Sequence, residues 1–189
     1  MDDQSALIGL DGEDVLASML RSDPETAFDY LEFRGILAGK CAAFAAQRAT
    51  DADIAMIEKA FNEMVAAYHT GDPALSAQAD AHFHLTTYVA AHNEMMLHVM
   101  KRLFGLLCED AFFDHGELYQ RVGVRDRFLR QHKAIYSAIA AHDPEAARIA
   151  ADEHLASTAE AVREAQRAGR RLQTSIRRRH GMTLTTTGS

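Results

Sequence analysis

The chain has 189 residues, of which 48% are hydrophobic and 25% charged, and its formal net charge is −7. This composition is ordinary for one globular domain with a sizeable core, and no apolar run approaches the ~20 residues that a membrane span needs. A domain that itself grips duplex nucleic acid is usually basic, so the net charge predicts that this chain alone binds little DNA.

The N-terminus and the cysteines indicate a cytoplasmic protein. Asp2 and Asp3 follow Met1, which is the wrong charge for the start of a secretory signal. Cys41 and Cys108 are far apart and fit no CxxC pattern. We therefore expect two reduced thiols, and the alternative is one disulfide between them.

Three Asp-Pro pairs predict helix starts, because Asp caps a helix well and Pro is tolerated at its first position. They are Asp23-Pro24, Asp72-Pro73 and Asp143-Pro144. Residues 1–22 contain no clear start and are interpreted as a linker or N-terminal segment with one short helix at 15–20. Apolar residues at helical spacing continue between these points, and no segment has the period of a strand.

The expected helices span residues 24–48, 51–70, 73–91, a segment capped by Asn93, a segment carrying 128–139, and 144–170. Residues 114–123 are expected to be a loop, and Gly71 a helix C-cap. The sequence thus predicts an all-α antiparallel bundle of six or seven helices over residues 23–173. Residues 174–189 are expected to form a flexible C-terminal tail that frays.

One pattern carries candidate metal chemistry. Asp80 and His84 are four residues apart and share one face of a helix. His132 and His154 each replace an expected apolar residue on a core-facing stripe of a later helix. A buried imidazole needs a polar partner, and a metal ion shared by these four side chains would provide one.

The alternative is that these histidines are simply buried and hydrogen-bonded. The chain has 10 histidines, so some fall on apolar stripes by chance. From spacing alone this alternative is favoured over a metal site. The other histidines are expected at the surface or around the cluster: His69, His82, His92, His98, His115, His142 and His180.

Four stretches resemble the FCD domain, the C-terminal effector-binding domain of FadR-type regulators in the GntR family. The resemblance covers about residues 23 to 165. The matching stretches are Tyr30-Leu31-Glu32-Phe33-Arg34 with Ala42 to Thr50, Asp80-Ala81-His82-Phe83-His84-Leu85, Ala90-Ala91-His92-Asn93, and His132-Lys133-Ala134-Ile135 followed by Asp143 and His154-Leu155. One departure is Ala38 after Leu37, where family members usually have Glu.

The resemblance implies a ligand set and a function. The family's metal-binding members use an Asp and a His on one helix and one His on each of two later helices, which fall here on Asp80, His84, His132 and His154. The expected cofactor is a divalent metal ion, zinc first, with nickel, manganese and iron as alternatives. The expected effector is a small 2-hydroxy or 2-oxo carboxylate, lactate or pyruvate first. Arg34 could pair with its carboxylate or form an interhelical salt bridge instead.

The resemblance also implies partners. FCD proteins are typically homodimers and act on DNA through an N-terminal winged-helix domain, which nothing in this chain resembles. We therefore expect the chain to be part of a longer regulator, with a stand-alone sensor as the alternative, and to have no membrane partner. The alternatives are a helical-bundle metalloenzyme, for which no HExxH pattern is present, and a helical interaction module without metal.

Overall fold

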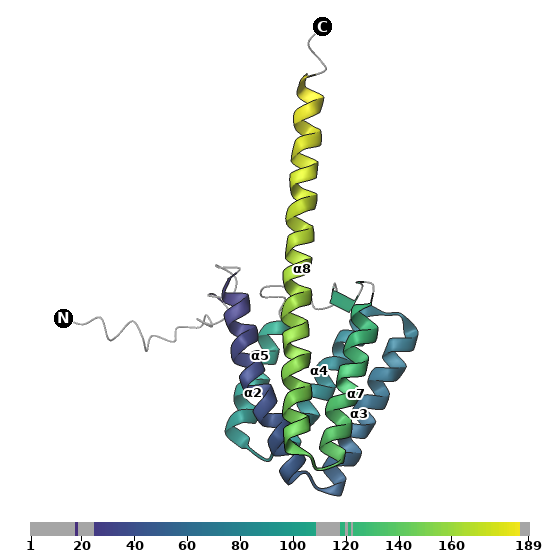
Figure 1. Ribbon diagram of the computed structural model, residues 1–189. Coiled ribbons are helices and arrows are strands. Elements are labelled where there is room, and N and C mark those ends of the chain that lie inside the picture. The colour runs from purple at the N-terminus through teal and green to yellow at the C-terminus, as the bar shows by residue number, and fades with distance from the viewer. Residues whose placement is uncertain (1–17, 19–24, 109–117, 120, 122, 186–189) are drawn as a thin grey trace, which may run out of the picture.

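The computed structural model describes residues 18, 25–108, 118–119, 121 and 123–185. Within these residues all regular structure is helical, and the long helices form an antiparallel bundle (Figure 1). The elements are α2 (Thr26–Arg48), α3 (Asp51–Thr70), α4 (Pro73–Ala90), α5 (Glu94–Cys108), α7 (Val124–Ala140) and α8 (Pro144–Thr185). The predicted all-α bundle of six or seven helices is confirmed. No helix in the described ranges is both long and apolar enough to cross a bilayer.

Several helix ends follow the predicted capping residues. The predicted start at Asp23-Pro24 lies outside the described residues, and α2 begins at Thr26 after Glu25, which makes no side-chain cap. Thr50 and Asp53 form a capping box at the start of α3, and Gly71 ends that helix with φ 76°. Asp72 accepts hydrogen bonds from two backbone amides of α4, and Asn93 accepts one from Met96 in α5. These caps fix where α4 and α5 begin.

The inner face of α2 packs along α8. Five residues at helical spacing along α2 are buried, namely Leu31, Arg34, Ala38, Cys41 and Ala45. Gly39 faces α8 so closely that an added Cβ would run into the carboxylate of Asp152. A side chain at position 39 would therefore displace the Asp152 carboxylate from its place beside α2.

Two histidines close similar turns between helices. His92 lies between α4 and α5 with φ 47°, and His142 lies between α7 and α8 with φ 51°. One ring nitrogen of His92 is 2.8 Å from Asp53 Oδ2, and Nδ1 of His142 is 2.9 Å from the carbonyl oxygen of Ala46. Each imidazole ties its turn to the neighbouring helix, and this contact supports a left-handed conformation that few residues other than Gly adopt.

Helix α8 is longer than predicted. It continues to Thr185, whereas the sequence indicated an end near Arg170. Every residue from 167 to 179 is exposed, so packing does not hold this part in place. Residues 171–185 contain four arginines and two leucines, which favour helix, and no proline follows Pro144, so local helix propensity allows the helix to continue. The predicted fraying of residues 174–189 stays a prediction, and the helix expected at 15–20 lies outside the described residues except for Ser18.

Candidate metal centre

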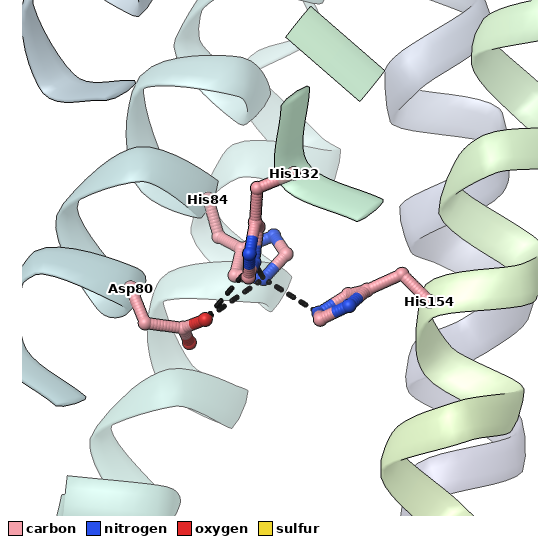
Figure 2. A group of neighbouring side chains, drawn as sticks. All are labelled: Asp80, His84, His132 and His154. Carbon is pink, nitrogen blue, oxygen red and sulfur yellow. Dashed lines mark hydrogen bonds and ion pairs between the residues drawn. The ribbon is translucent and has the colours of Figure 1, made fainter. Parts of the chain in front are cut away.

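Three helices bring the four predicted ligands to one point. Asp80 and His84 are one turn apart on α4, His132 lies on α7 and His154 on α8, and their side chains point toward one another (Figure 2). The exposed fractions of Asp80, His84, His132 and His154 are 2%, 3%, 0% and 3%. The residues chosen from the sequence therefore form one buried cluster of four side chains.

The donor atoms of this cluster are very close to one another. Nε2 of His84 is 3.1 Å from Nε2 of His132 and 3.2 Å from Nε2 of His154. Oδ1 of Asp80 is 3.0 Å from Nε2 of His132 and 3.8 Å from Nε2 of His84. One ligand atom from each of the four residues lies within 4.8 Å of all the others, so a single ion could contact all four.

Hydrogen bonding within the cluster cannot satisfy these contacts. A ring nitrogen carries either one proton or one lone pair, so Nε2 of His84 cannot form good hydrogen bonds to both neighbouring Nε2 atoms. Adjacent ligands bound about 2.1 Å from one ion in octahedral geometry would stand about 3.0 Å apart, which matches the shortest contacts observed. Three imidazoles and one carboxylate are also a donor set suited to zinc, nickel, manganese or iron. The residues present therefore fit a divalent metal ion.

Neighbouring polar groups orient two of the four side chains. Nδ1 of His154 is 3.4 Å from Oε1 of Gln131, whose amide nitrogen donates to Oγ of Ser157 over 2.7 Å. This contact favours a proton on Nδ1 and leaves the Nε2 lone pair directed at the cluster. The hydroxyl of Tyr119 donates to Oδ1 of Asp80 over 2.7 Å. Burial, followed by the Asp80 carboxylate, raises the pKa of Tyr119 well above its usual value, so this phenol stays a donor.

The family model of the FCD domain matches residues 29–157, which includes all four candidate ligands. The chain belongs to the FCD family.

Curated relatives of this FCD domain are bacterial transcription regulators of the GntR family. The Glc operon transcriptional activator of Escherichia coli K12 is 31% identical over 74% of this chain and 56% of its own length. The putative L-lactate dehydrogenase operon regulatory protein of the same strain is 33% identical over 74% of this chain and 53% of its own length. The regulator LutR of Bacillus subtilis is 31% identical over 74% and 64%, respectively. The chain thus spans little more than half the length of the first two relatives.

Solved structures show the same fold as this FCD domain. The structure of Lar, which controls expression of the Listeria monocytogenes agr system, has a TM-score of 0.65 and 21% identity, covering 76% of this chain and 66% of Lar. The structure of E. coli McbR/YncC has a TM-score of 0.63 and 16% identity, covering 74% and 69%. At these identities the likeness concerns the fold alone.

Arg34 of the FCD domain lies beside the cluster. Its guanidinium carbon is 4.3 Å from the ring centroid of Phe104, and the same ring is 5.7 Å from the ring of His84. Burial alone would lower the pKa of Arg34, but Tyr88, Tyr30 and Asp80 nearby outweigh it and raise the pKa. Nε of Arg34 and the hydroxyl of Tyr88 are buried and make no hydrogen bond of normal geometry within the described residues.

Two hollows bear on where a ligand could enter. A small cavity reaches His132 and Tyr119 from the side of Tyr68 and Arg125. A larger groove runs between α2 and α8, but none of the four candidate ligands lines it. The small cavity touches one candidate ligand, His132, but at about 10 Å³ it holds no more than one water molecule, and Arg34 does not line it.

Most of the other histidines have separate local partners, as predicted for surface positions. His82 is adjacent to the ligand motif, but its Nδ1 is 3.0 Å from Glu63 on α3. Nδ1 of His98 is 3.0 Å from the carbonyl oxygen of Glu94. His115 and the side chain of His180 lie outside the described residues. Sequence reasoning missed Tyr119 and Gln131, since Tyr119 falls in an expected loop and Gln131 occupies a helix position where a polar residue is unremarkable.

The stability of the metal-stripped FCD domain is expected to fall as the pH is lowered. Burial, followed by the neighbouring His132 and His84, holds the pKa of His154 well below its ordinary value. The unfolded chain therefore takes up a proton first, so the contribution of His154 is complete above about pH 6.5 and is lost as the pH falls toward the folded pKa. Thermal melts between about pH 8 and about pH 5.5 measure this effect. His154→Leu should reduce the dependence, His98→Leu should not, and equal slopes in all three proteins would refute the assignment.

Proposed function

We propose that this chain is the metal-dependent sensor domain of a GntR-type transcription regulator that acts in the cytoplasm. Asp80, His84, His132 and His154 would hold the ion, with zinc first among the candidates. The observation that carries this proposal is the convergence of three imidazoles and one carboxylate in a buried site where hydrogen bonds alone cannot satisfy them. The relatives support the regulatory part, because their names are those of operon regulators.

The proposed effector is a small 2-hydroxy or 2-oxo carboxylate, with lactate and pyruvate first. A divalent ion bound by three neutral imidazoles and one carboxylate would keep a net charge near +1 and offer open positions to two adjacent oxygen atoms. The guanidinium of Arg34 lies beside the same cluster and would pair with the effector's carboxylate. A relative named for an L-lactate dehydrogenase operon supports placing lactate first.

Titration calorimetry should detect this effector directly. We expect lactate or pyruvate to release heat with zinc-loaded protein and to release none after chelation, because chelation removes the positions that hold the two oxygens. Glycolate tests whether the methyl group matters, and acetate is the control that lacks the second donor oxygen. If none of these acids gives heat or a melting shift with loaded protein, the proposed effector class is wrong.

The proposed output is a population shift in a homodimer. The effector would bind one arrangement of the bundle better, and so change the spacing of two winged-helix domains that lie outside this chain. Light scattering tests the dimer, and a monomer mass at high protein concentration would refute it. The metalloenzyme alternative gains no support from the relatives, which are transcription regulators.

A further inference from the structure

The last part of α8 extends from the bundle as a single helix. We call residues 165–185 the C-terminal arm; it projects beyond the other helices at the end of the bundle where α2 begins (Figure 1). At about 1.5 Å per residue the arm is about 30 Å long. Its side chains are exposed from residue 167 through residue 179. The arm therefore presents its whole circumference to whatever surrounds the bundle.

The charge of the chain is divided between this arm and the rest. Six arginines follow residue 164, and Glu164 is the last acidic residue in the sequence. Since the whole chain carries −7 and residues 165–189 carry +6, residues 1–164 carry the difference, −13. The net charge of the whole chain does not reveal this separation. The prediction that the chain alone binds little DNA was based on that net charge, whereas a partner that contacts only the arm meets only positive charge.

The arginines gather on one side of α8. We define the basic face as Arg163, Arg167, Arg170, Arg171, Arg177 and Arg178, which recur at the spacing of a single helix face. The face spans about 22 Å along the helix axis. The opposite side carries Ala165, Ala168, Gly169, Leu172 and Ile176, together with one arginine, Arg179. The spacing of the arginines thus determines both the side of α8 that carries positive charge and the length over which it does so.

A groove at the base of the arm gives the basic face a concave end. It is lined by Arg163, Arg167, Arg170, Gln166, Glu25 and Phe28. The guanidinium carbon of Arg163 is 4.8 Å from the ring centroid of Phe28 on α2, which holds that cation at the groove wall. Three guanidinium groups around one hollow suit an oxyanion that accepts paired hydrogen bonds, as a phosphate does.

We propose that the C-terminal arm binds the phosphate backbone of duplex nucleic acid through its basic face. An α-helix about 10–12 Å across fits a major groove about 12 Å wide, and contacts to phosphate alone carry no sequence preference. This goes beyond the proposed sensor function and does not depend on the metal. The arm would add a second, nonspecific contact with DNA to that of the proposed winged-helix domains.

Two other partners fit the arm less well. Helices that lie on a membrane bury bulky side chains such as Trp and Phe, and residues 165–189 contain no aromatic residue. Pairing of two arms needs an apolar stripe sustained over three or four heptads, but Ala165 to Ile176 spans fewer than two, and only Leu172 and Ile176 are large. Charge therefore outweighs apolar contact as the basis for recognition.

Fluorescence anisotropy with the 189-residue protein and two labelled duplexes of unrelated sequence tests the proposal. We expect equal binding to both duplexes, weakening steeply with salt. The triple variant Arg167→Gln, Arg171→Gln, Arg178→Gln should lose at least about tenfold in affinity at low salt, and the slope of log K against log salt should fall by up to about 2.7. The control variant Lys59→Gln, Lys101→Gln, Lys133→Gln removes the same charge from exposed body positions and should bind like the wild type.

The outcomes separate the possible partners. Gln favours helix and the replaced side chains are exposed, so circular dichroism and melting should match the wild type in both variants. Chelation should leave duplex binding unchanged, which keeps this result separate from the metal proposal. The proposal is overturned if no duplex binding occurs at low salt, or if both triple variants weaken equally. It is also overturned if the arm variant changes only binding to anionic phospholipid vesicles or only the mass in sedimentation.

Discussion

Replacing His132 with Ala is expected to abolish stable metal binding and, with it, the largest ligand-dependent stabilisation of the domain. His132 is fully buried, and its Nε2 contacts both Asp80 and His84. An ion at about 1,000 times its dissociation constant stabilises the folded state by about 4 kcal/mol. For a chain of this size that corresponds to about 8–16 °C in melting temperature. Elemental analysis and melting curves before and after chelation measure both quantities.

The variant must be compared with the matched substitution His82→Ala. His82 is two residues from His84 but is half-exposed and paired with Glu63, so its loss should leave metal content unchanged. The His132 variant should melt at the same temperature with and without chelator, because no bound ion remains to be removed. If it retains one equivalent of metal and the wild-type response to chelator, His132 is not a ligand. If the wild type itself holds no metal and does not respond, the metal-free interaction module becomes the preferred reading.

Replacing Arg34 with Met is expected to remove carboxylate binding while leaving the metal in place. The side chain is buried against Phe104, and Met can fill much of the same apolar space without the charge. Removing one partner of a buried charge pair typically costs about 2–5 kcal/mol, so the effector's affinity should fall by about 30-fold to several thousand-fold. Calorimetry with the effector and elemental analysis of the same sample separate the two effects.

Arg48→Met is the control on the same helix. Its guanidinium carbon is 3.9 Å from the ring centroid of Phe44, and the side chain donates to the carbonyl oxygen of Ala91, away from the cluster. This variant should bind the effector like the wild type. Unchanged effector affinity in the Arg34 variant would show that the carboxylate pairs elsewhere, with Arg125 at the small cavity as the next residue to test.

Helical periodicity was sufficient to predict the bundle and the positions of the polar residues inside it. His132 and His154 were recognisable because each interrupts an apolar stripe, and both stripes are buried in the structure. Asp80 and His84 were recognisable because one turn of helix places them on one face. The spacing alone left a hydrogen-bonded cluster as the preferred reading. The distances between the three Nε2 atoms reverse that preference, because one proton per nitrogen cannot serve all of the contacts.

Other features depend on tertiary position and leave no local signal. Tyr119 reaches Asp80 from a short segment without periodicity, and Gln131 reaches His154 from the neighbouring helix. The left-handed turns at His92 and His142 depend on partners that are distant in sequence. The end of α8 was placed too early, near Arg170, and the residues from Thr174 on were interpreted as a flexible tail. Propensity without packing was enough to extend it.

Because α8 is one uninterrupted helix, a tilt at one end would displace its other end. His154 and Arg178 belong to the same 42-residue helix, about 36 Å apart along its axis. A tilt of only about 5° pivoting at His154 would swing the far end by about 3 Å, a displacement comparable to a hydrogen-bond length. A small movement of His154 would thus become a larger displacement at the exposed end of α8, without any hinge. A proline near Gly169 would break the helix and so separate the motion of its exposed end from that of His154.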